Sequence, residues 1–303
     1  MNKRGAILIF SLLVIMVSSI LVAAFYLQSI SENQLATRYA DSTRAFWLAE
    51  AGIARVKSIP GPPAALSDIS FDGNFHYKYI VDAPILVVGT TDCYNIVSTG
   101  TVTSLSGDIK RKVNVTMKLN PPNASQFQFG VETTSNDLDY KAKCIKNPEN
   151  PDNIAKTGST QIFSNLFGIS KAEMKAISQA QGTYLSGSFG NTINASGVTW
   201  VDVTPGETLD IQHLNGSGIV IINGNFKVNG VPADGFNGIL YIVGQLQTLG
   251  NSTVYGTVFV ESSAAIGADL TGSSLITYNF ANIASALNGV ATKSIVSWRE
   301  KYD

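Results

Sequence analysis

Charged residues, cysteines and histidines are all scarce in this sequence, and each shortage narrows the class of protein. Charged residues make up 14% of the 303 residues, against about 25% in typical soluble domains. Hydrophobic residues make up 45%, and the formal net charge is -1. A near-neutral charge argues against a broad basic surface. We therefore expect a membrane segment or a β-rich body, and no nucleic-acid partner.

The two cysteines, Cys93 and Cys144, are far apart and lack the CxxC spacing of metal and redox sites. A disulfide between them in an oxidising compartment and two unrelated buried thiols are both compatible with the sequence. A chain of this length buries a substantial core, so its size requires no disulfide scaffold. Cysteine spacing therefore predicts neither a metal centre nor redox chemistry.

Groups that transfer protons or attack substrates are also scarce. His76 and His213 are the only histidines, neither has an HxxxH or HxH partner, and the sequence contains no GxSxG elbow or P-loop. Paired carboxylates of the glycosidase kind are the remaining catalytic option, and the candidates are Asp202, Glu207, Asp210 and Asp234. They lie in turn-like sequence, where aspartate ordinarily forms turns. We expect no enzyme, no metal and no cofactor.

Residues 6–27 form an uncharged apolar run, AILIFSLLVIMVSSILVAAFYL, without glycine or proline. As a helix this run spans roughly 33 Å, which matches the hydrocarbon core of a bilayer. Lys3 and Arg4 precede the run, and the next charged residue is Glu32. The positive-inside rule then places the N-terminus in the cytoplasm and the body of the chain outside the inner membrane.

Three interpretations of this segment compete. A secretory signal peptide requires cleavage after a small-residue site, and Val22-Ala23-Ala24 before Phe25 is an acceptable one. A plain signal anchor requires no cleavage. In the third, residues 1–5 are a short basic leader that ends at Gly5, and a protease cuts before Ala6, so that the transmembrane helix remains in the mature protein.

The helical pattern continues beyond the apolar run to about residue 58. Apolar and small residues recur at alternating steps of four and three, which predicts one docked face: Leu35, Tyr39, Ser42, Phe46, Ala49, Ile53 and Val56. Residues 6–58 then form one helix of roughly 80 Å. Three prolines, at positions 60, 62 and 63, end it.

This N-terminal region resembles that of type IV pilin-like proteins, especially PilX-type minor pilins. The resemblance extends from the N-terminus to about position 58 and depends on Arg4-Gly5, the uncharged helix start, and AFWLAEAGIARV at positions 45–56. It implies cleavage between Gly5 and Ala6 by a prepilin peptidase and methylation of the new N-terminus. It also implies that the helix packs against other pilins through residues that include Phe10, Leu35, Tyr39, Phe46 and Ile53.

One position departs from the pattern of the major pilins. They usually carry glutamate at the fifth mature position, where it neutralises the amino terminus of the adjacent subunit, a valuable pair in lipid. Here that position is Phe10. We therefore expect a minor subunit that initiates assembly or sits at the tip, in a pilus or a type II secretion pseudopilus, at the inner membrane or the cell surface. Glu50 is expected to be solvated or intrahelical rather than an assembly contact.

The rest of the chain is predicted to be β-rich, so the fold class is α+β. Alternating runs such as IKRKVNVTMKL, at residues 109–119, predict an antiparallel meander over residues 64–120 that packs on the helix. Residues 121–165 are polar and are expected to form an irregular linker. Ser170 and Glu173 form a capping box that opens a short helix.

A loose repeat follows within the predicted C-terminal domain, residues 166–303. Short β-rich runs begin at Gly218, Gly238, Gly256 and Ser274, with nearly constant spacing. This period predicts a small β-helix or solenoid, and a β-sandwich of hairpins is the alternative. The second functional hypothesis follows from it: a membrane-anchored extracytoplasmic module that binds or acts on carbohydrate.

Overall fold

The computed structural model describes residues 3–64, 66–70, 74–81, 85–87, 90–104, 107–141, 143–187, 190–230, 235–248, 251–264, 266–270 and 273–301. The chain forms two compact units. We call one the helix–sheet unit (Met1–Val56, Ala64–Met117 and Ile295–Asp303) and the other the ladder unit (Lys57–Pro63 and Lys118–Ser294). The α+β fold class is confirmed by one long helix together with antiparallel and parallel sheets.

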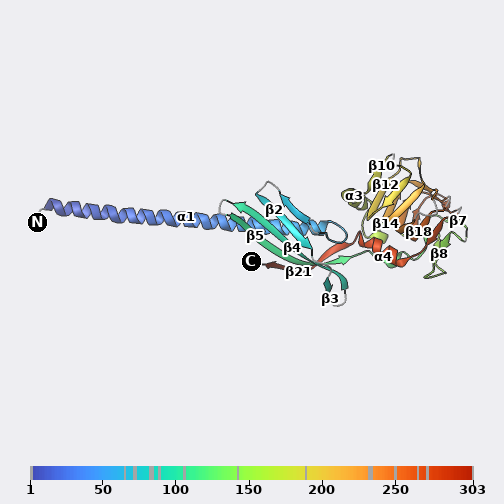
Figure 1. The fold of residues 1–303 in the computed structure, drawn as a ribbon, viewed down its shortest axis with the longest axis horizontal. Helices are drawn as coiled ribbons and strands as arrows, with labels where there is room; N and C mark the ends of the chain where they lie inside the picture. Colours follow the sequence, from blue (N-terminus) through green and yellow to red (C-terminus); the bar gives the residue numbers. More distant parts are fainter. Residues whose placement is uncertain are drawn as a thin grey trace. The chain divides into compact units, whose positions relative to one another are not determined.

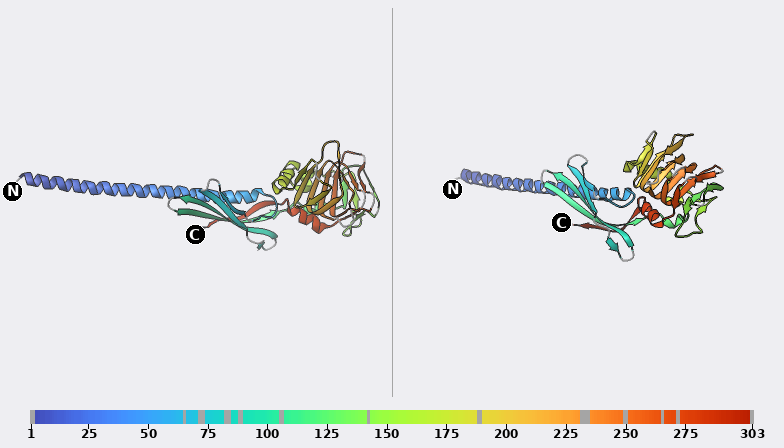
Figure 2. Two further views of the ribbon diagram at one scale, coloured as in Figure 1. Left: turned by 45° about the horizontal axis from the view of Figure 1, so that its top comes forward. Right: turned by 45° about the vertical axis from the view of Figure 1, so that its right-hand side comes forward.

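Helix α1 (Lys3–Ser58) is continuous, as the sequence predicts, and begins three residues before the expected start at Ala6. Figures 1 and 2 show it as one uninterrupted rod. Its C-terminus comes just before the prolines at positions 60, 62 and 63, because proline lacks the amide hydrogen that a helix requires. The sheet beside it contains β1 (Leu66–Ser70), β2 (Phe75–Val81), β3 (Ile85–Val87), β4 (Thr90–Ser104), β5 (Gly107–Asn120) and β21 (Thr292–Lys301).

The order of this sheet is β1-β2-β4-β5-β21, with β3 beside β4. Strand β2 runs antiparallel to β1 and to β4, and β3 runs antiparallel to β4, as predicted. Strand β21 is an unpredicted member, because it comes from the end of the predicted C-terminal domain. It runs antiparallel to β5, since Ser294 bonds to Asn120, Ser297 to Thr116, and Glu300 pairs with Arg111. The assignment of all residues from 166 to 303 to one domain is therefore wrong at its end.

The ladder unit contains two sheets of short strands. The order of the first is β10-β12-β14-β16-β18-β20-β8, with β6, β9 and β11 off this path. Its members are β6 (Val131–Thr133), β8 (Ile145–Lys146), β9 (Ala155–Lys156), β10 (Tyr184–Ser186), β11 (Thr192–Ala195), β12 (Val198–Asp202), β14 (His213–Asn223), β16 (Phe236–Val243), β18 (Thr253–Glu261) and β20 (Leu275–Thr277). The order of the second is β13-β15-β17-β19-β7, formed by β7 (Asp137–Tyr140), β13 (Thr208–Ile211), β15 (Asn225–Val228), β17 (Leu246–Thr248) and β19 (Ile266–Leu270).

The repeated runs predicted from the sequence lie side by side in parallel register. Gly218 lies opposite Gly238, and Gly238 lies opposite Gly256. Hairpins between these runs are excluded, because the pairing is parallel. The fourth run is out of step with the prediction: Ile276 lies opposite Val254, so Ser274 does not align with Gly256.

The first sheet of the ladder unit is buried on both faces. One face packs against the second sheet through residues such as Val220, Ile222, Phe226 and Leu246. The other packs against helices α2 (Phe163–Phe167), α3 (Lys171–Gln181) and α4 (Phe280–Asn288), and against Phe127, which follows η1 (Ala124–Gln126). Burial on both faces explains the continuous apolar runs of these strands, as in other parallel sheets. The predicted capping box of α3 is confirmed.

The polar segment 121–165 is not an irregular linker. It supplies β6, β7, β8 and β9, and the first three pair with β18, β19 and β20. These strands contain two to four residues each, which is too short for a recognisable β pattern in the sequence. They form because neighbouring strands pair with them. The segment therefore extends both parallel sheets.

The ladder unit also includes the short segment Lys57–Pro63, which follows the docked part of α1, and it ends at Ser294 within β21. The amide of Gly61 donates to the carbonyl of Ala291 at 2.9 Å, and the Lys293 ammonium donates to the carbonyl of Ile59. Burial lowers the pKa of Lys293 to about 8, because a buried ammonium loses its hydration. These bonds tie the segment after α1 to the start of β21.

Candidate functional site: the two halves of helix α1

The first half of α1 is apolar and exposed. Every described side chain from Phe10 to Ala40 is exposed, including Phe10 at 69%, Ile15 at 66% and Tyr26 at 67%. The helix is long and apolar enough to cross a membrane, and the apolar stretch that makes it so is not buried within the described chain. A run of large exposed apolar side chains is unfavourable in water. This half is therefore suited to lipid or to other apolar helices.

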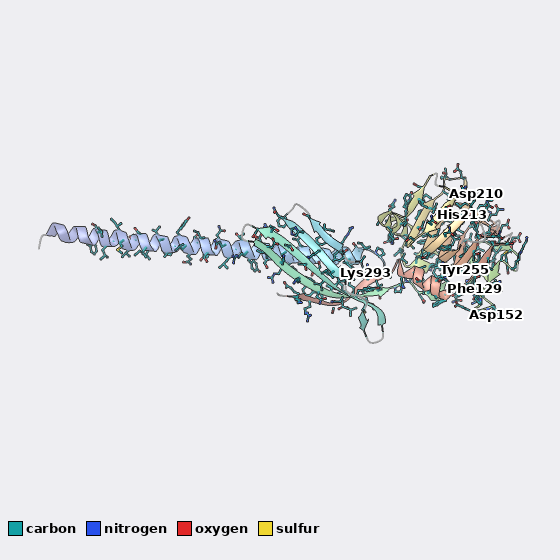
Figure 3. The ribbon with its side chains drawn as sticks, in the orientation of Figure 1. Phe129, Asp152, Asp210, His213, Tyr255 and Lys293 are labelled. Carbon is teal, nitrogen blue, oxygen red and sulfur yellow. The ribbon has the colours of Figure 1, made fainter. Side chains whose placement is uncertain are left out.

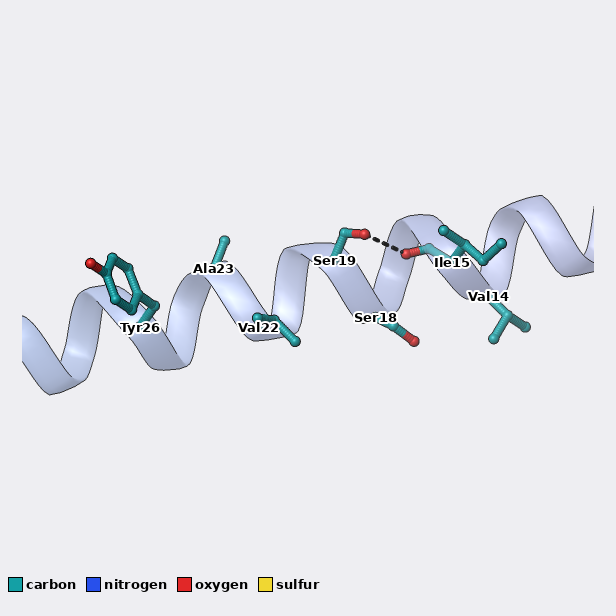
Figure 4. Close-up of a pocket in the computed structure, with 7 residues that line it drawn as sticks. All are labelled: Val14, Ile15, Ser18, Ser19, Val22, Ala23 and Tyr26. Atoms are coloured by element: carbon teal, nitrogen blue, oxygen red, sulfur yellow. Dashed lines mark hydrogen bonds between the residues drawn. The ribbon is translucent and has the colours of Figure 1, made fainter.

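A shallow groove runs along one side of this half (Figure 4). It has a volume of about 570 Å³ and is lined by Val14, Ile15, Ser18, Ser19, Val22, Ala23 and Tyr26. The Ser19 hydroxyl donates to the carbonyl of Ile15 at 2.8 Å, so the helix itself satisfies that hydroxyl. Small residues between larger ones allow another helix to approach closely in a membrane.

The predicted processing site lies at the start of the same helix. The backbone of Lys3, Arg4, Gly5 and Ala6 is helical. Their side chains lie outside the described residues. The structure thus places the junction at the end of an exposed helix, and cleavage there stays a prediction.

The second half of α1 is docked on the sheet through small residues. Ala45 and Ala49 are fully buried, and Ile53 and Val56 are 2% exposed. A Cβ atom on Gly100 of β4 would lie 2.0 Å from the Ala45 carbonyl oxygen and 2.5 Å from the Ala49 nitrogen. Helix and strand backbones therefore approach so closely that only glycine fits at position 100.

The predicted docked face is partly wrong. Leu35 and Tyr39 are 64% and 78% exposed, whereas Ile53 is buried as expected. Phe46 is half-buried at the edge of the core. Burial begins at Asp41 and follows Ala45, Ala49, Gly52, Ile53 and Val56. The signal that was missed is the spacing of alanine and glycine, which permits close approach but contributes little hydrophobicity.

Polar bonds surround the docked face. Arg111 donates from Nε to the Ser42 hydroxyl at 2.7 Å, and buried Asp41 pairs with Arg44 at 3.1 Å. Glu50 accepts a 2.7 Å hydrogen bond from Nε1 of Trp298 in β21. Glu50 therefore joins the helix to the last strand, rather than being merely solvated or intrahelical as expected.

The carboxylates proposed as glycosidase candidates have structural partners. Asp202 accepts hydrogen bonds of 2.6 Å from Lys175, 2.7 Å from Tyr184, 2.8 Å from Trp200 and 3.0 Å from Asn223. Burial opposes ionisation, but the bonds from these donors outweigh it and hold the pKa of Asp202 well below its usual value. A carboxylate stabilised in this way is a poor proton donor at neutral pH.

Asp210, like Asp202, has structural partners. Asp210 accepts from Lys227 at 2.8 Å and from Asn229 at 2.6 Å. Glu207 lies exposed in a turn, and Asp234 lies outside the described residues. His213 lies on β14 of the ladder unit and is labelled in Figure 3. His76 lies on β2 of the helix–sheet unit. Within the described part of the chain no three His, Cys, Asp or Glu side chains gather as metal ligands.

The cysteines do not form a disulfide. Cys93 is 1% exposed in β4, and Cys144 is fully buried before β8. They belong to different units. The sequence left open a disulfide and two unrelated buried thiols, and the structure agrees with the second.

Comparisons with known proteins identify no relative. Neither the family models, the curated proteins nor the solved structures include a match to this chain.

Proposed function

We propose that this chain is a pilin-like, non-enzymatic structural subunit, anchored in the inner membrane by the first half of α1. It is a minor subunit that acts in initiation or at the tip of a type IV pilus or pseudopilus. Its partners are other pilins and a prepilin peptidase, its body is extracytoplasmic, and it needs no cofactor.

One observation carries the proposal: a single helix has an exposed apolar half and a docked half. A simple anchor needs only a flexible connection to its domain. Here the helix continues without interruption from Phe10 into the buried face at Ala45 and Ala49. The sheet of the helix–sheet unit is thus fixed to the apolar half, as a subunit requires if packing of the helix is to position that unit in a polymer.

Mass spectrometry of the mature protein tests the proposal. We expect a chain that begins at Ala6 with a methylated amino group, produced only when a prepilin peptidase is present. A Gly5→Ala variant keeps the helix, because alanine is the better helix former, but should block this cleavage. An intact N-terminus in the presence of the peptidase contradicts the proposal, and a start at Phe25 contradicts any retained anchor.

The minor role has its own test at Phe10. Phe10→Glu restores the carboxylate that major pilins use, so we expect the variant to enter the filament shaft in more copies than wild type. Phe10→Gln is the matched control, since it has similar polarity and no charge. Equal copy number for wild type and Phe10→Glu removes the reason for assigning a minor role.

A second candidate function is favoured by the ladder unit. The parallel register through Gly218, Gly238 and Gly256 supports the proposal that this unit is a small β-helix. Such a unit exposes strand ends and turns on which a binding surface is readily built. The chain would then be a membrane-anchored binding module, with or without assembly.

A further inference from the structure

A polar groove lies where the two sheets of the ladder unit meet. Its volume is about 610 Å³, and it is lined by Thr134, Asn225, Val243, Gly244, Gln245, Glu261, Ser262, Ser263 and Ala264. These residues come from the ends of β16 and β18, the start of β15 and the turns beside them. The volume is within the range of about 300–1,000 Å³ that is typical of small-ligand sites.

The backbone of the groove is fixed by its own hydrogen bonds. Asn225 Oδ1 accepts from the amide of Gln245 at 3.0 Å, and the Gly244 amide donates to the carbonyl of Glu261 at 2.8 Å. The Thr134 hydroxyl donates to the Ser262 carbonyl at 3.0 Å and accepts from the Ser262 amide at 2.9 Å. The lining is therefore preorganised, which reduces the entropy lost when a ligand binds.

Several polar groups remain for a ligand. Oδ1 of Asn225 accepts from the amide of Gln245. The Nδ2 donor of Asn225 has no partner among the described residues. The same holds for Oε1 of Glu261, whose Oε2 is bonded to Tyr241 and Lys171 at 2.6 Å each, and for the exposed Ser263 hydroxyl. Donors and acceptors are thus mixed within one groove.

The lining also excludes two classes of ligand. Among the described residues of the lining, Val243 and Ala264 are the only apolar side chains, so an apolar ligand would bury little surface. Glu261 is the one charged residue among them, and Lys171 balances that charge, so the groove has little net attraction for an ion. What remains is an uncharged ligand with closely spaced hydroxyl groups. We propose that this groove binds a neutral saccharide.

Binding to an array of neutral, sialylated and sulfated glycans tests the proposal. The full chain is used in a sugar-free zwitterionic detergent, because the headgroups of glycoside detergents would compete. We expect saturable binding to neutral glycans that Ser263→Trp weakens at least tenfold by filling the groove. Glu261→Gln should weaken it several-fold, since it changes the free acceptor Oε1.

Asn194→Trp is the matched control, because Asn194 is also exposed on the ladder unit but lies outside the groove lining. It should bind as wild type does, and equal thermal melting of all the variants excludes unfolding. Absence of binding to neutral glycans, binding to sulfated glycans alone, or neutral-glycan binding that Ser263→Trp leaves unchanged overturns the proposal. The N-terminal helix takes no part in this test, so its outcome is independent of pilin-like assembly.

Discussion

The two halves of α1 are one secondary-structure element with opposite surroundings. The first half has large apolar side chains and none of those described is buried, whereas the second half is docked and buries Ala45, Ala49 and Gly52 together with Ile53 and Val56. Hydrophobicity alone would predict the reverse. In the docked half, small residues let the backbones of helix and strand approach closely at Gly100. The most apolar surface is left for lipid or for another molecule.

The largest effect is expected where the docked half touches the sheet. In Gly100→Val the new Cβ would overlap backbone atoms of Ala45 and Ala49, which cannot move aside as a flexible side chain does. We expect a loss of about 4 kcal/mol of stability and rapid hydrogen exchange in residues 41–58. Gly190→Ala is the control, because nothing lies within 4 Å of a Cβ there. Slow exchange in Gly100→Val would show that close approach is not required.

A pair of truncations compares the two halves directly. Ile53→Ala removes a side chain that is 2% exposed and should cost about 3 kcal/mol. Leu35→Ala removes one that is 64% exposed and should change stability by less than about 0.5 kcal/mol. Chemical denaturation of both variants measures the difference. Equal costs would mean that Leu35 is also packed within the chain.

A charge in the apolar half should act on the membrane rather than on folding. Val17→Arg places a guanidinium near the middle of the apolar run, at a cost of about 3 kcal/mol for insertion. We expect loss of the protein from carbonate-washed membranes. Thr37→Arg, on the exposed polar part of the same helix, should remain membrane-bound. Full membrane retention of Val17→Arg would argue that this half packs on protein instead of lipid.

Alkaline pH should loosen the docked half. Burial, together with neighbouring Tyr77, raises the pKa of Tyr79 in spite of nearby Arg55, because a buried tyrosinate loses its hydration. A raised folded-state pKa means that stability is fully present below the unfolded pKa of about 10 and is lost as the pH rises through the folded value. Tyr79→Phe should flatten this part of a melting-temperature profile recorded through the alkaline range, and an unchanged slope would contradict the assignment.

A small effect is expected at the edge of the docked face. Trp298→Phe removes the hydrogen bond to Glu50 but keeps an aromatic ring beside Phe46, 6.3 Å away between centroids. We expect a loss of about 0.5–1 kcal/mol. A double-mutant cycle with Glu50→Gln measures the coupling, and Trp47→Phe is the control because Trp47 is 65% exposed. Zero coupling would assign Trp298 to packing alone.

Strong local patterns predicted much of the fold. The apolar run and the prolines predicted α1, and alternation predicted antiparallel strands such as β5. The regularly spaced runs at Gly218, Gly238 and Gly256 predicted strands that lie side by side. Each of these signals is contained in a short stretch of sequence. The same chain does not cover Leu35 and Tyr39, because periodicity identifies a face without saying what covers it, and their contact with other pilins stays a prediction.

Features that depend on distant segments were not predictable in the same way. β6 and β8 have three and two residues and exist because β18 and β20 offer them a parallel edge. Glu261 and Asn225 are far apart in the numbering, and they line one groove only because successive strands stack. Neither contact leaves a local trace in composition or period.

Strand β21 comes after the other described strands and helices in the sequence but completes the sheet that holds α1. Until it is synthesised, β5 has an open edge that invites pairing with other chains, and Glu50 lacks its hydrogen-bond donor Trp298. The docked helix is therefore finished only after the ladder unit has emerged. Chains truncated before residue 292 would carry an unfinished sheet, so the order of the elements makes completion of this sheet depend on the synthesis of residues 292–301.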